Sequence, residues 1–336
     1  MLRSALSSGS DWKVLATVLV VLLFGEFGLS LAEPRLSLDV QHIRSIPAIV
    51  RTFEAAPGPG VLFLGNSLTR AGIRPDAVEG AWPPHNLPRA KFALVYPDDT
   101  RLLDWFYVYR RFVEPARSRP RVIVVCFAQS QLADGQPLQP ERLGSQFAGL
   151  PFLTEAFSDD VLSASDRISY VLGATSRMWA NRERVQTRVL ALIPGYEALA
   201  QTLNRAASVR QDASGDGRPD TYTRLARFIE RVGKDGVGVV FVATPLPRRF
   251  PLPDELRRTI HDGGAELLDL QGMEPADPGD FTDGYHMSPA AAERFSASLG
   301  AALAANAYFR TALVGRRPAD HSVSAAGRSG LQAVAH

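Results

Sequence analysis

Residues 61–70 read Val-Leu-Phe-Leu-Gly-Asn-Ser-Leu-Thr-Arg and directly follow the turn-forming residues Pro57-Gly58-Pro59-Gly60. A short apolar run bounded by turn residues is typical of a buried strand. The glycine lets the chain bend sharply, and the bend carries Ser67 to the carboxyl end of that strand. Ligands bind at this edge of open parallel sheets, so Ser67 is a candidate nucleophile if a base reaches it.

Four further apolar runs resemble the first. The predicted strands cover residues 61–65, 91–95, 121–127, 236–243 and 265–270. A helix capped by Asp99 or Thr100 is expected to run through Val113, and a last helix to begin after the N-cap Ser288. Strands that alternate with helices predict a five-stranded parallel sheet with helices on both faces, a three-layer, flavodoxin-like α/β fold.

One long segment departs from this alternation. Residues from about 134 to 235 are mostly helical in pattern, with helices expected over 166–181 and 182–207, and are predicted to form a cap beside the sheet edge. With this helical insert, the α/β domain covers residues 61–310. The tail at 315–336 is rich in alanine, serine and glycine and is predicted to be disordered.

The N-terminal part of the chain contains an apolar segment of 19 residues, 14–32, which is broken by the polar residues Thr17, Glu26 and Ser30. About 20 apolar residues cross a bilayer core, so the segment predicts a transmembrane helix. Basic residues in 1–13 favour a cytoplasmic N-terminus and an exported body. A cleaved signal peptide is the alternative, because Ser30-Leu31-Ala32 is an acceptable cleavage site.

Both interpretations place the body of the protein outside the cytoplasmic membrane. It is either anchored there by a single span or released as a secreted or periplasmic protein. Residues 33–60 are predicted to form a juxtamembrane helical stalk, with apolar residues at helical spacing: Ile43, Ile46, Ile49, Val50 and Phe53.

The amino-acid composition limits the classes of protein to which this chain can belong. The 336 residues are 46% hydrophobic and 21% charged, as in a globular protein, and the formal net charge of +2 argues against a nucleic-acid surface. The single cysteine, Cys126, lies in an apolar run and is expected to be a buried thiol. The six histidines are dispersed, so no metal or cofactor is predicted.

A serine hydroxyl becomes a nucleophile when a base takes its proton, and histidine suits that task near neutral pH. His286 follows the last predicted strand, and Asp283 lies three residues before it, where one short turn can present both side chains to the same cleft. Ser67, His286 and Asp283 are therefore the candidate catalytic residues at one sheet edge. Asp280 is a competing partner for His286, with a less suitable spacing.

The stretch Gly65-Asn66-Ser67-Leu68 resembles the first block of the SGNH/GDSL hydrolase superfamily, and Asp283-Gly284-Tyr285-His286 resembles its last block. The resemblance spans roughly residues 60–305. It implies a flavodoxin-like sheet with Ser67 as the nucleophile and Asp283 and His286 as its acid–base pair.

The middle blocks depart from the family pattern. The family places a glycine after the second strand and Gly-x-Asn-Asp after the third, where they contribute to the oxyanion hole. Residues 93–98 and 126–131 lack the expected glycine and asparagine. The backbone of Ser67 is then the expected oxyanion donor, with Gln129, Ser130 and Gln131 as candidate side-chain donors.

A divergent middle together with a membrane segment is similar to the exported SGNH-like proteins of alginate O-acetylation and teichoic acid D-alanylation. That similarity implies a membrane-bound O-acyltransferase as partner, an acyl donor, and a hydroxyl of an exported glycan as acceptor. The triad does not choose the acceptor, because water gives an esterase and a sugar hydroxyl gives a transferase. The departures in the middle blocks support a different hypothesis, a non-catalytic assembly or glycan-binding protein on a degenerate hydrolase fold.

Overall fold

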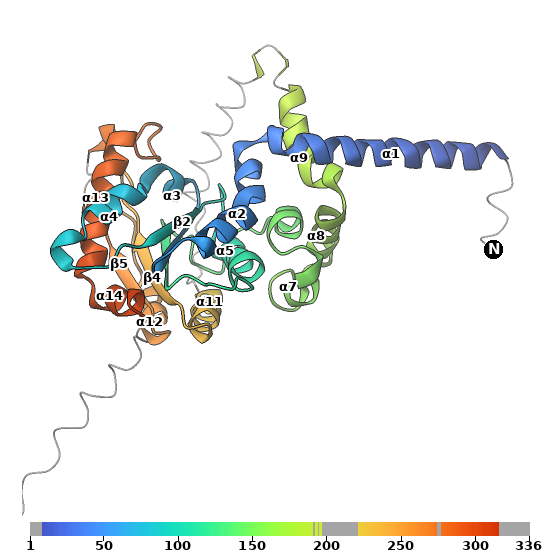
Figure 1. The fold of residues 1–336 in the computed structure, drawn as a ribbon. Helices are drawn as coiled ribbons and strands as arrows, with labels where there is room; N and C mark the ends of the chain where they lie inside the picture. The colour runs from blue at the N-terminus through green and yellow to red at the C-terminus, as the bar shows by residue number, and fades with distance from the viewer. Residues whose placement is uncertain (1–8, 191, 194, 197–220, 274–276, 316–336) are drawn as a thin grey trace, which may run out of the picture. The chain divides into compact units, whose positions relative to one another are not determined.

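The computed structural model describes residues 9–190, 192–193, 195–196, 221–273 and 277–315, which group into two compact units (Figure 1). The helical unit contains residues up to Arg44 and residues 138–219. The α/β unit contains residues 45–137 and the residues from 220 onward.

The α/β unit is built on one sheet of five parallel strands in the order β2-β1-β3-β4-β5. The strands are β1 (Gly60–Leu64), β2 (Lys91–Val95), β3 (Val122–Phe127), β4 (Gly238–Ala243) and β5 (Glu266–Asp269). Every strand begins and ends within two residues of its predicted position, and the predicted α/β class is confirmed. The strand order reverses direction between β1 and β3, which is where ligands bind in sheets of this topology.

The central strands β1, β3 and β4 are buried along their whole length, as expected for a parallel sheet covered on both faces. One face packs against α13 (Pro289–Ala305) and α14 (Ala307–Leu313), where Phe63 and Val124 meet Phe295 and Leu299. The other face packs against α11 (Thr223–Lys234), whose Phe228 ring lies 6.3 Å from that of Phe241.

The remaining helices of the α/β unit lie in its connections. They are α3 (Ser67–Gly72), α4 (Pro75–Gly80), η1 (Pro83–His85), α5 (Leu102–Val108), the π-helical turn η2 (Tyr109–Val113), α12 (Asp254–Asp262) and η5 (Pro278–Asp280). Helix α13 begins after Ser288, whose hydroxyl accepts a hydrogen bond from the backbone of Ala291, as the sequence predicts.

The predicted cap of the helix after β2 is wrong. The N-cap of α5 is Arg101, whose backbone N–H donates to the carboxylate of Asp104 at 3.1 Å. Thr100 is not available for capping because its hydroxyl accepts a hydrogen bond from the indole N–H of Trp105. Asp99 has a φ of 50°, a left-handed conformation that does not fit an N-cap.

Helix α11, which the sequence prediction assigned to the insert, belongs to the α/β unit and is the connection into β4. Its apolar face (Leu225, Phe228, Ile229 and Val232) is buried. Its first turn is held by Asp134, whose carboxylate accepts hydrogen bonds from the backbone of Thr223 at 2.7 Å and Arg224 at 3.0 Å.

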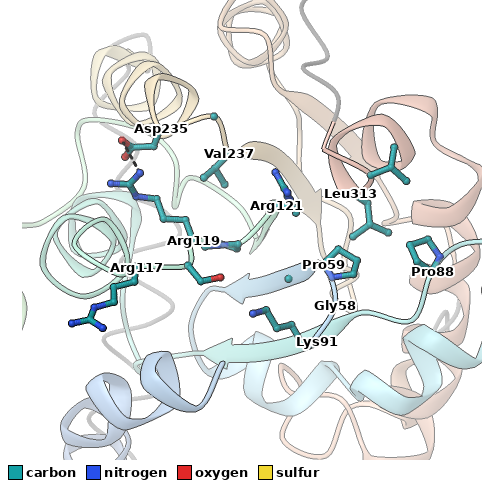
Figure 2. A pocket seen from close by; sticks show the side chains of 15 residues that line it. Gly58, Pro59, Pro88, Lys91, Arg117, Arg119, Arg121, Asp235, Val237 and Leu313 are labelled. Atoms are coloured by element: carbon teal, nitrogen blue, oxygen red, sulfur yellow. Dashed lines mark ion pairs between the residues drawn. The ribbon is translucent and has the colours of Figure 1, made fainter. Parts of the chain in front are cut away.

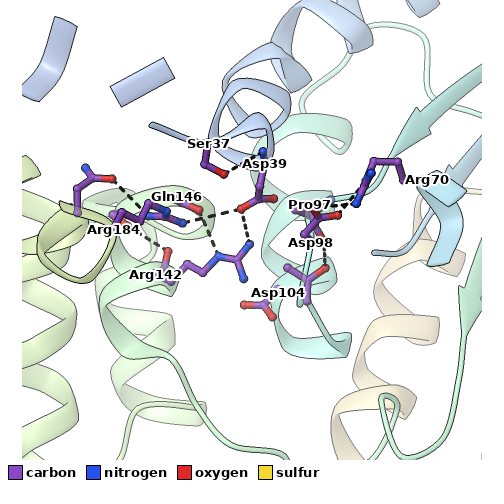
Figure 3. Close-up of polar contacts among 12 residues, drawn as sticks. Ser37, Asp39, Arg70, Pro97, Asp98, Asp104, Arg142, Gln146 and Arg184 are labelled. Atoms are coloured by element: carbon purple, nitrogen blue, oxygen red, sulfur yellow. Dashed lines mark hydrogen bonds and ion pairs between the residues drawn. The ribbon is translucent and has the colours of Figure 1, made fainter. Parts of the chain in front are cut away.

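The helical unit combines α1 (Gly9–Leu36) with short and longer helices of the insert. These are α6 (Pro140–Arg142), η3 (Leu143–Phe147), η4 (Leu150–Phe152), α7 (Leu153–Asp159), α8 (Ala164–Thr175) and α9 (Arg177–Leu190). Asp39 joins two of them, because its carboxylate lies 2.9 Å from Arg142 and 3.8 Å from Arg184 (Figure 3).

The predicted boundary between the two long insert helices is wrong. The break lies at Ser176, which has an extended backbone and whose hydroxyl accepts the backbone N–H of Trp179 at 3.0 Å. The predicted helix 182–207 falls largely outside the described residues after 190, and so does the predicted disordered tail after Gly315.

Among the described helices, α1 is the one with the length and composition to cross a membrane, over Trp12–Glu33. The predicted span 14–32 lies inside it, and an anchor and a signal sequence both meet this test. The stretch predicted as a juxtamembrane helical stalk, residues 33–60, is helical over most of its length. In α2 (Leu38–Ala55), Ile46 and Phe53 are buried, and Phe53 packs against Gly60, so residues 45–60 are part of the α/β unit.

Candidate active site

Ser67 begins α3 immediately after the bend at the carboxyl end of β1. The bend requires Gly65, because a Cβ atom there would lie 2.0 Å from Oγ1 of Thr69 and 2.9 Å from the carbonyl oxygen of Cys126. Asn66 is the N-cap of α3, and its Oδ1 accepts the backbone N–H of Leu68 at 3.0 Å. The hydroxyl of Ser67 is therefore not used for capping.

Asn66 also fixes the bend from its other side. Its buried amide Nδ2 donates to the carbonyl oxygen of Thr100 at 3.1 Å, and the Thr100 hydroxyl in turn accepts from Trp105. The loop after β2 is thus fastened to the turn that carries Ser67, which restrains the orientation of that side chain.

Asp283 and His286 lie on one tight turn before α13. Gly284 makes the turn with a φ of 78°, which L side chains rarely adopt. Oδ1 of Asp283 accepts the backbone N–H groups of Tyr285 at 3.0 Å and of His286 at 2.7 Å. An antiparallel bridge between Phe281 and Met287 closes the turn.

The three predicted residues lie together in the structure. Nδ1 of His286 is 2.7 Å from Oδ2 of Asp283, and Nε2 of His286 is 2.8 Å from Oγ of Ser67. Asp280, the competing partner, instead pairs with Arg294 at 2.8 Å. The arrangement gives an unbroken chain of hydrogen bonds from a carboxylate through an imidazole to a hydroxyl.

The carboxyl of Asp283 favours its ionised form. Partial burial opposes ionisation, but hydrogen bonds from the His286 side chain and from the backbone of His286 and Tyr285 outweigh it and lower the pKa to about 2. A carboxylate is therefore present at neutral pH to hold Nδ1–H of His286, which leaves Nε2 as the acceptor facing Ser67.

The candidate oxyanion donors differ in how they are held. The side-chain oxygen of Gln131 accepts a hydrogen bond from the backbone N–H of Ala128 at 3.0 Å. This contact stabilises the loop after β3 from within. Gln129 and Ser130 are exposed on the same loop after β3, and Gln129 has a φ of 50°. Strain of this kind in a non-glycine residue often accompanies a functional position.

The structure adds residues that the sequence argument missed. Arg70, one turn after Ser67, pairs with Asp98 on the loop after β2, with Nε and Oδ1 3.2 Å apart (Figure 3). The ring of Tyr285 stands edge-on to that of His286 with centroids 5.2 Å apart, and burial raises the pKa of Tyr285. No spacing rule joins Arg70 to Asp98, because they lie on different loops.

A separate hollow of about 570 Å³ lies at the opposite edge of the sheet, around the starts of β1 to β4 (Figure 2). Its lining includes Lys91, Arg117, Arg119 and Arg121, with Asp235 paired to Arg119 at 3.8 Å. Parallel strands run in one direction, so this hollow is distinct from the edge that carries Ser67. Within the described residues, no group of histidine, cysteine, aspartate or glutamate side chains could hold a metal ion.

No protein-family model matches the chain, and no curated protein matches it by sequence. Two solved structures are similar to it at a distance. A lipase/acylhydrolase from Enterococcus faecalis has a TM-score of 0.38 and 11% identity, covering 73% of this chain and 95% of that one. A catalytic mutant of Axe2, an acetylxylan esterase from Geobacillus stearothermophilus, has a TM-score of 0.34 and 13% identity. The match covers 76% of this chain and 98% of that one.

Proposed function

We propose that the protein catalyses serine-dependent acyl transfer through an ester formed on Ser67. The observation that supports this proposal is the hydrogen-bond chain from Asp283 through His286 to Ser67, with contacts of 2.7 and 2.8 Å. Each contact has the length and the order that nucleophilic catalysis by an alcohol requires.

In the first half of the reaction, Oγ of Ser67 attacks the carbonyl carbon of an ester while its proton moves to Nε2 of His286. The carboxylate of Asp283 stabilises the imidazolium that forms. The tetrahedral intermediate collapses, the bond to the leaving alcohol breaks, and His286 returns the proton to that alcohol. The backbone N–H of Ser67 is the first candidate donor to the oxyanion, with Gln129 and Ser130 as side-chain candidates.

In the second half, an acceptor hydroxyl attacks the acyl-Ser67 ester with His286 as general base. Water as acceptor makes the protein an esterase, and a sugar hydroxyl makes it an O-acyltransferase. The apolar helix α1 favours a membrane-proximal acyl donor, and hence transfer to an exported glycan on the outer side of the cytoplasmic membrane. The sequence resemblance adds a membrane-bound O-acyltransferase as the proposed source of the acyl group.

The test of the chemistry is covalent labelling of the full chain with a fluorophosphonate probe, followed by peptide mapping. We expect the label on Ser67, no label in Ser67→Ala, and strongly reduced labelling in His286→Ala. Turnover of p-nitrophenyl acetate should fall by about 10⁴-fold or more in Ser67→Ala. An unlabelled wild-type protein that still binds glycan would support the non-catalytic hypothesis.

The acceptor requires a separate measurement. Wild-type protein acylated on Ser67 by an activated ester is mixed with water alone or with a soluble polysaccharide fragment, and the products are separated by mass spectrometry. Acylated fragment at the expense of free acid identifies a transferase. Release of free acid at the same rate in both mixtures identifies an esterase.

A further inference from the structure

Glu26 is a carboxylate in the middle of the apolar helix α1, and the structure gives it partners on α9. It accepts the backbone N–H of Arg177 at 2.6 Å and of Met178 at 3.3 Å, and a hydrogen bond from the Ser176 hydroxyl. These are N–H groups that the first turn of a helix leaves without partners in the helix itself. Glu26 therefore supplies hydrogen-bond acceptors to the N–H groups at the start of α9, and those groups supply donors to its carboxylate.

A second contact joins the same two helices further along. Glu33 is only 1% exposed and lies 3.4 Å from Arg177, and it accepts a hydrogen bond from Nδ2 of the buried Asn181 at 3.1 Å. Next to Glu26 the two helices approach closely, because a Cβ atom on Gly25 would lie 2.8 Å from Sδ of Met178. Helix α9 is thus fastened to the second half of α1 (Figure 1).

The length of α1 sets the depth of this contact. Trp12–Glu33 contains 22 residues, about 33 Å of helix, which matches a hydrocarbon core of about 30 Å. Trp12–Gly25 alone would be about 21 Å long, too short to cross. If α1 spans the bilayer, Glu26 lies about 10 Å inside the end at Glu33, and the first turn of α9 lies beside it.

Two exposed side chains of that turn suit lipid, whereas the guanidinium of Arg177 in the same turn pairs with Glu33. Met178 and Trp179 are each 37% exposed although both are large and apolar. The guanidinium of Arg182 lies 4.5 Å from the centre of the Trp179 ring, one turn further along α9. Tryptophan with a flanking arginine is the usual composition at the boundary between hydrocarbon and head groups.

We infer that α1 stays in the mature protein and that the first turn of α9 enters the outer leaflet beside it, with lipid covering Met178 and Trp179. A carboxylate and a helix N-terminus are each costly in hydrocarbon, and pairing them offsets part of each cost. Cleavage after Ala32 would remove Glu26 and leave the N–H groups of Arg177 and Met178 without their acceptor. The helical unit is in this way a membrane-associated element, independently of the chemistry at Ser67.

The experiment places a fluorophore on α9 in the full chain. Trp179→Cys and, as the matched control on the same helix, Val189→Cys are labelled with an environment-sensitive dye and reconstituted in phosphatidylcholine vesicles. Val189 is 57% exposed and lies about 15 Å further along α9. We expect spin-labelled lipid to quench the dye at 179 and not at 189, and a water-soluble quencher to do the reverse. Equal access of the aqueous quencher to both positions would overturn the inference.

Two variants test the role of Glu26. Glu26→Leu keeps the span apolar but removes the acceptor, so the dye at 179 should move from lipid to water, whereas Glu26→Gln should retain part of the lipid exposure. The buried thiol of Cys126 reports on the fold of the α/β unit, and its protection should not change. A dye at 179 that stays in lipid in Glu26→Leu would show that the carboxylate does not hold α9 there.

The position of the mature N-terminus tests whether α1 is retained. Intact mass of the protein extracted from native membranes should include residues 1–32, and a chain that begins at Glu33 would overturn the inference. Protection of position 179 in native membranes but not in pure lipid vesicles would also overturn it, and would indicate a protein partner on this face.

Discussion

Nε2 of His286 lies 2.8 Å from Oγ of Ser67, and Nδ1 of the same ring lies 2.7 Å from the carboxylate of Asp283. The ring is therefore held from both sides, so its tautomer follows from its partners. Nδ1 carries the proton that the carboxylate accepts, and the lone pair on Nε2 faces the serine hydroxyl. The hydroxyl of Ser67 therefore lies within hydrogen-bond distance of an acceptor nitrogen of His286.

Replacement of Asp283 by asparagine should lower kcat by about 10⁴-fold, because an amide N–H facing Nδ1 reverses the tautomer of His286. Asp280→Asn is the matched control, since Asp280 pairs with Arg294 and should affect stability more than turnover. Steady-state kinetics with an activated ester checks both variants. A large loss of kcat in Asp280→Asn with none in Asp283→Asn would reverse the assignment of the orienting carboxylate.

The free energy of unfolding should depend on pH because of the ionisation of Asp283 in the turn before α13. Its pKa is about 2 in the folded protein against an ordinary value of 3.8, so the ionised carboxylate stabilises the folded state above about pH 4, and this contribution disappears as pH falls through about 2. The difference in free energy of unfolding between wild type and Asp283→Asn should shrink in the same range. Urea titrations at neutral pH and near pH 2 measure it. A difference that stays constant would rule out the carboxylate as its source.

Gly65→Ala should destabilise the α/β unit by about 1–3 kcal/mol or more, because the added methyl group would meet Thr69 and the backbone of Cys126. Gly80→Ala is the control, since a Cβ there meets nothing within 4 Å, and its effect should stay within about 0.5 kcal/mol. Thermal unfolding compares the two. Equal melting temperatures would mean that the bend before Ser67 relaxes freely.

The thiol of Cys126 should not react in the folded protein. Burial raises its pKa to about 12, and a hydrogen bond with Thr69 offsets only part of that effect. The thiolate fraction at neutral pH is then very small, and the sulfur is also closed to solvent. A maleimide reagent should label the protein in denaturant and leave it unlabelled under native conditions. Rapid stoichiometric labelling of the native protein would contradict the burial of β3.

Gln129→Gly should lower kcat without lowering the stability of the fold. Glycine adopts a φ of 50° without strain, so the free energy of unfolding should stay constant or rise by up to about 1 kcal/mol. If the side chain donates to the oxyanion, kcat should fall by about 10²–10³-fold with little change in KM. Ser130→Ala is the parallel variant on the same loop. Full activity in both variants would mean that backbone N–H groups stabilise the oxyanion without either side chain.

The sheet was predictable because its information is local. Each strand is an apolar run between turn residues, and Ser288 marks the start of α13 because its side chain caps the helix. The pairing of His286 with Asp283 was also predictable, since three residues on one turn fix their separation. The residues Ser67 and His286, 219 positions apart, could be joined only by assuming that parallel strands share an edge.

Other features depended on contacts that no spacing encodes. The cap of α5 moved to Arg101 because the hydroxyl of Thr100 accepts a hydrogen bond from Trp105, and the break at Ser176 depends on Glu26 from the other end of the chain. Asp134 holds the start of α11 in the same way across a long insert.

By itself, then, the sequence determined the strands, the apolar N-terminal helix and the three residues of the candidate site, because apolar pattern and turn chemistry act over a few positions. The tertiary structure decided what each polar group in a loop or helix end pairs with. Such partners are chosen by distance in the folded chain, and a buried donor or acceptor takes whichever group the fold brings within about 3 Å.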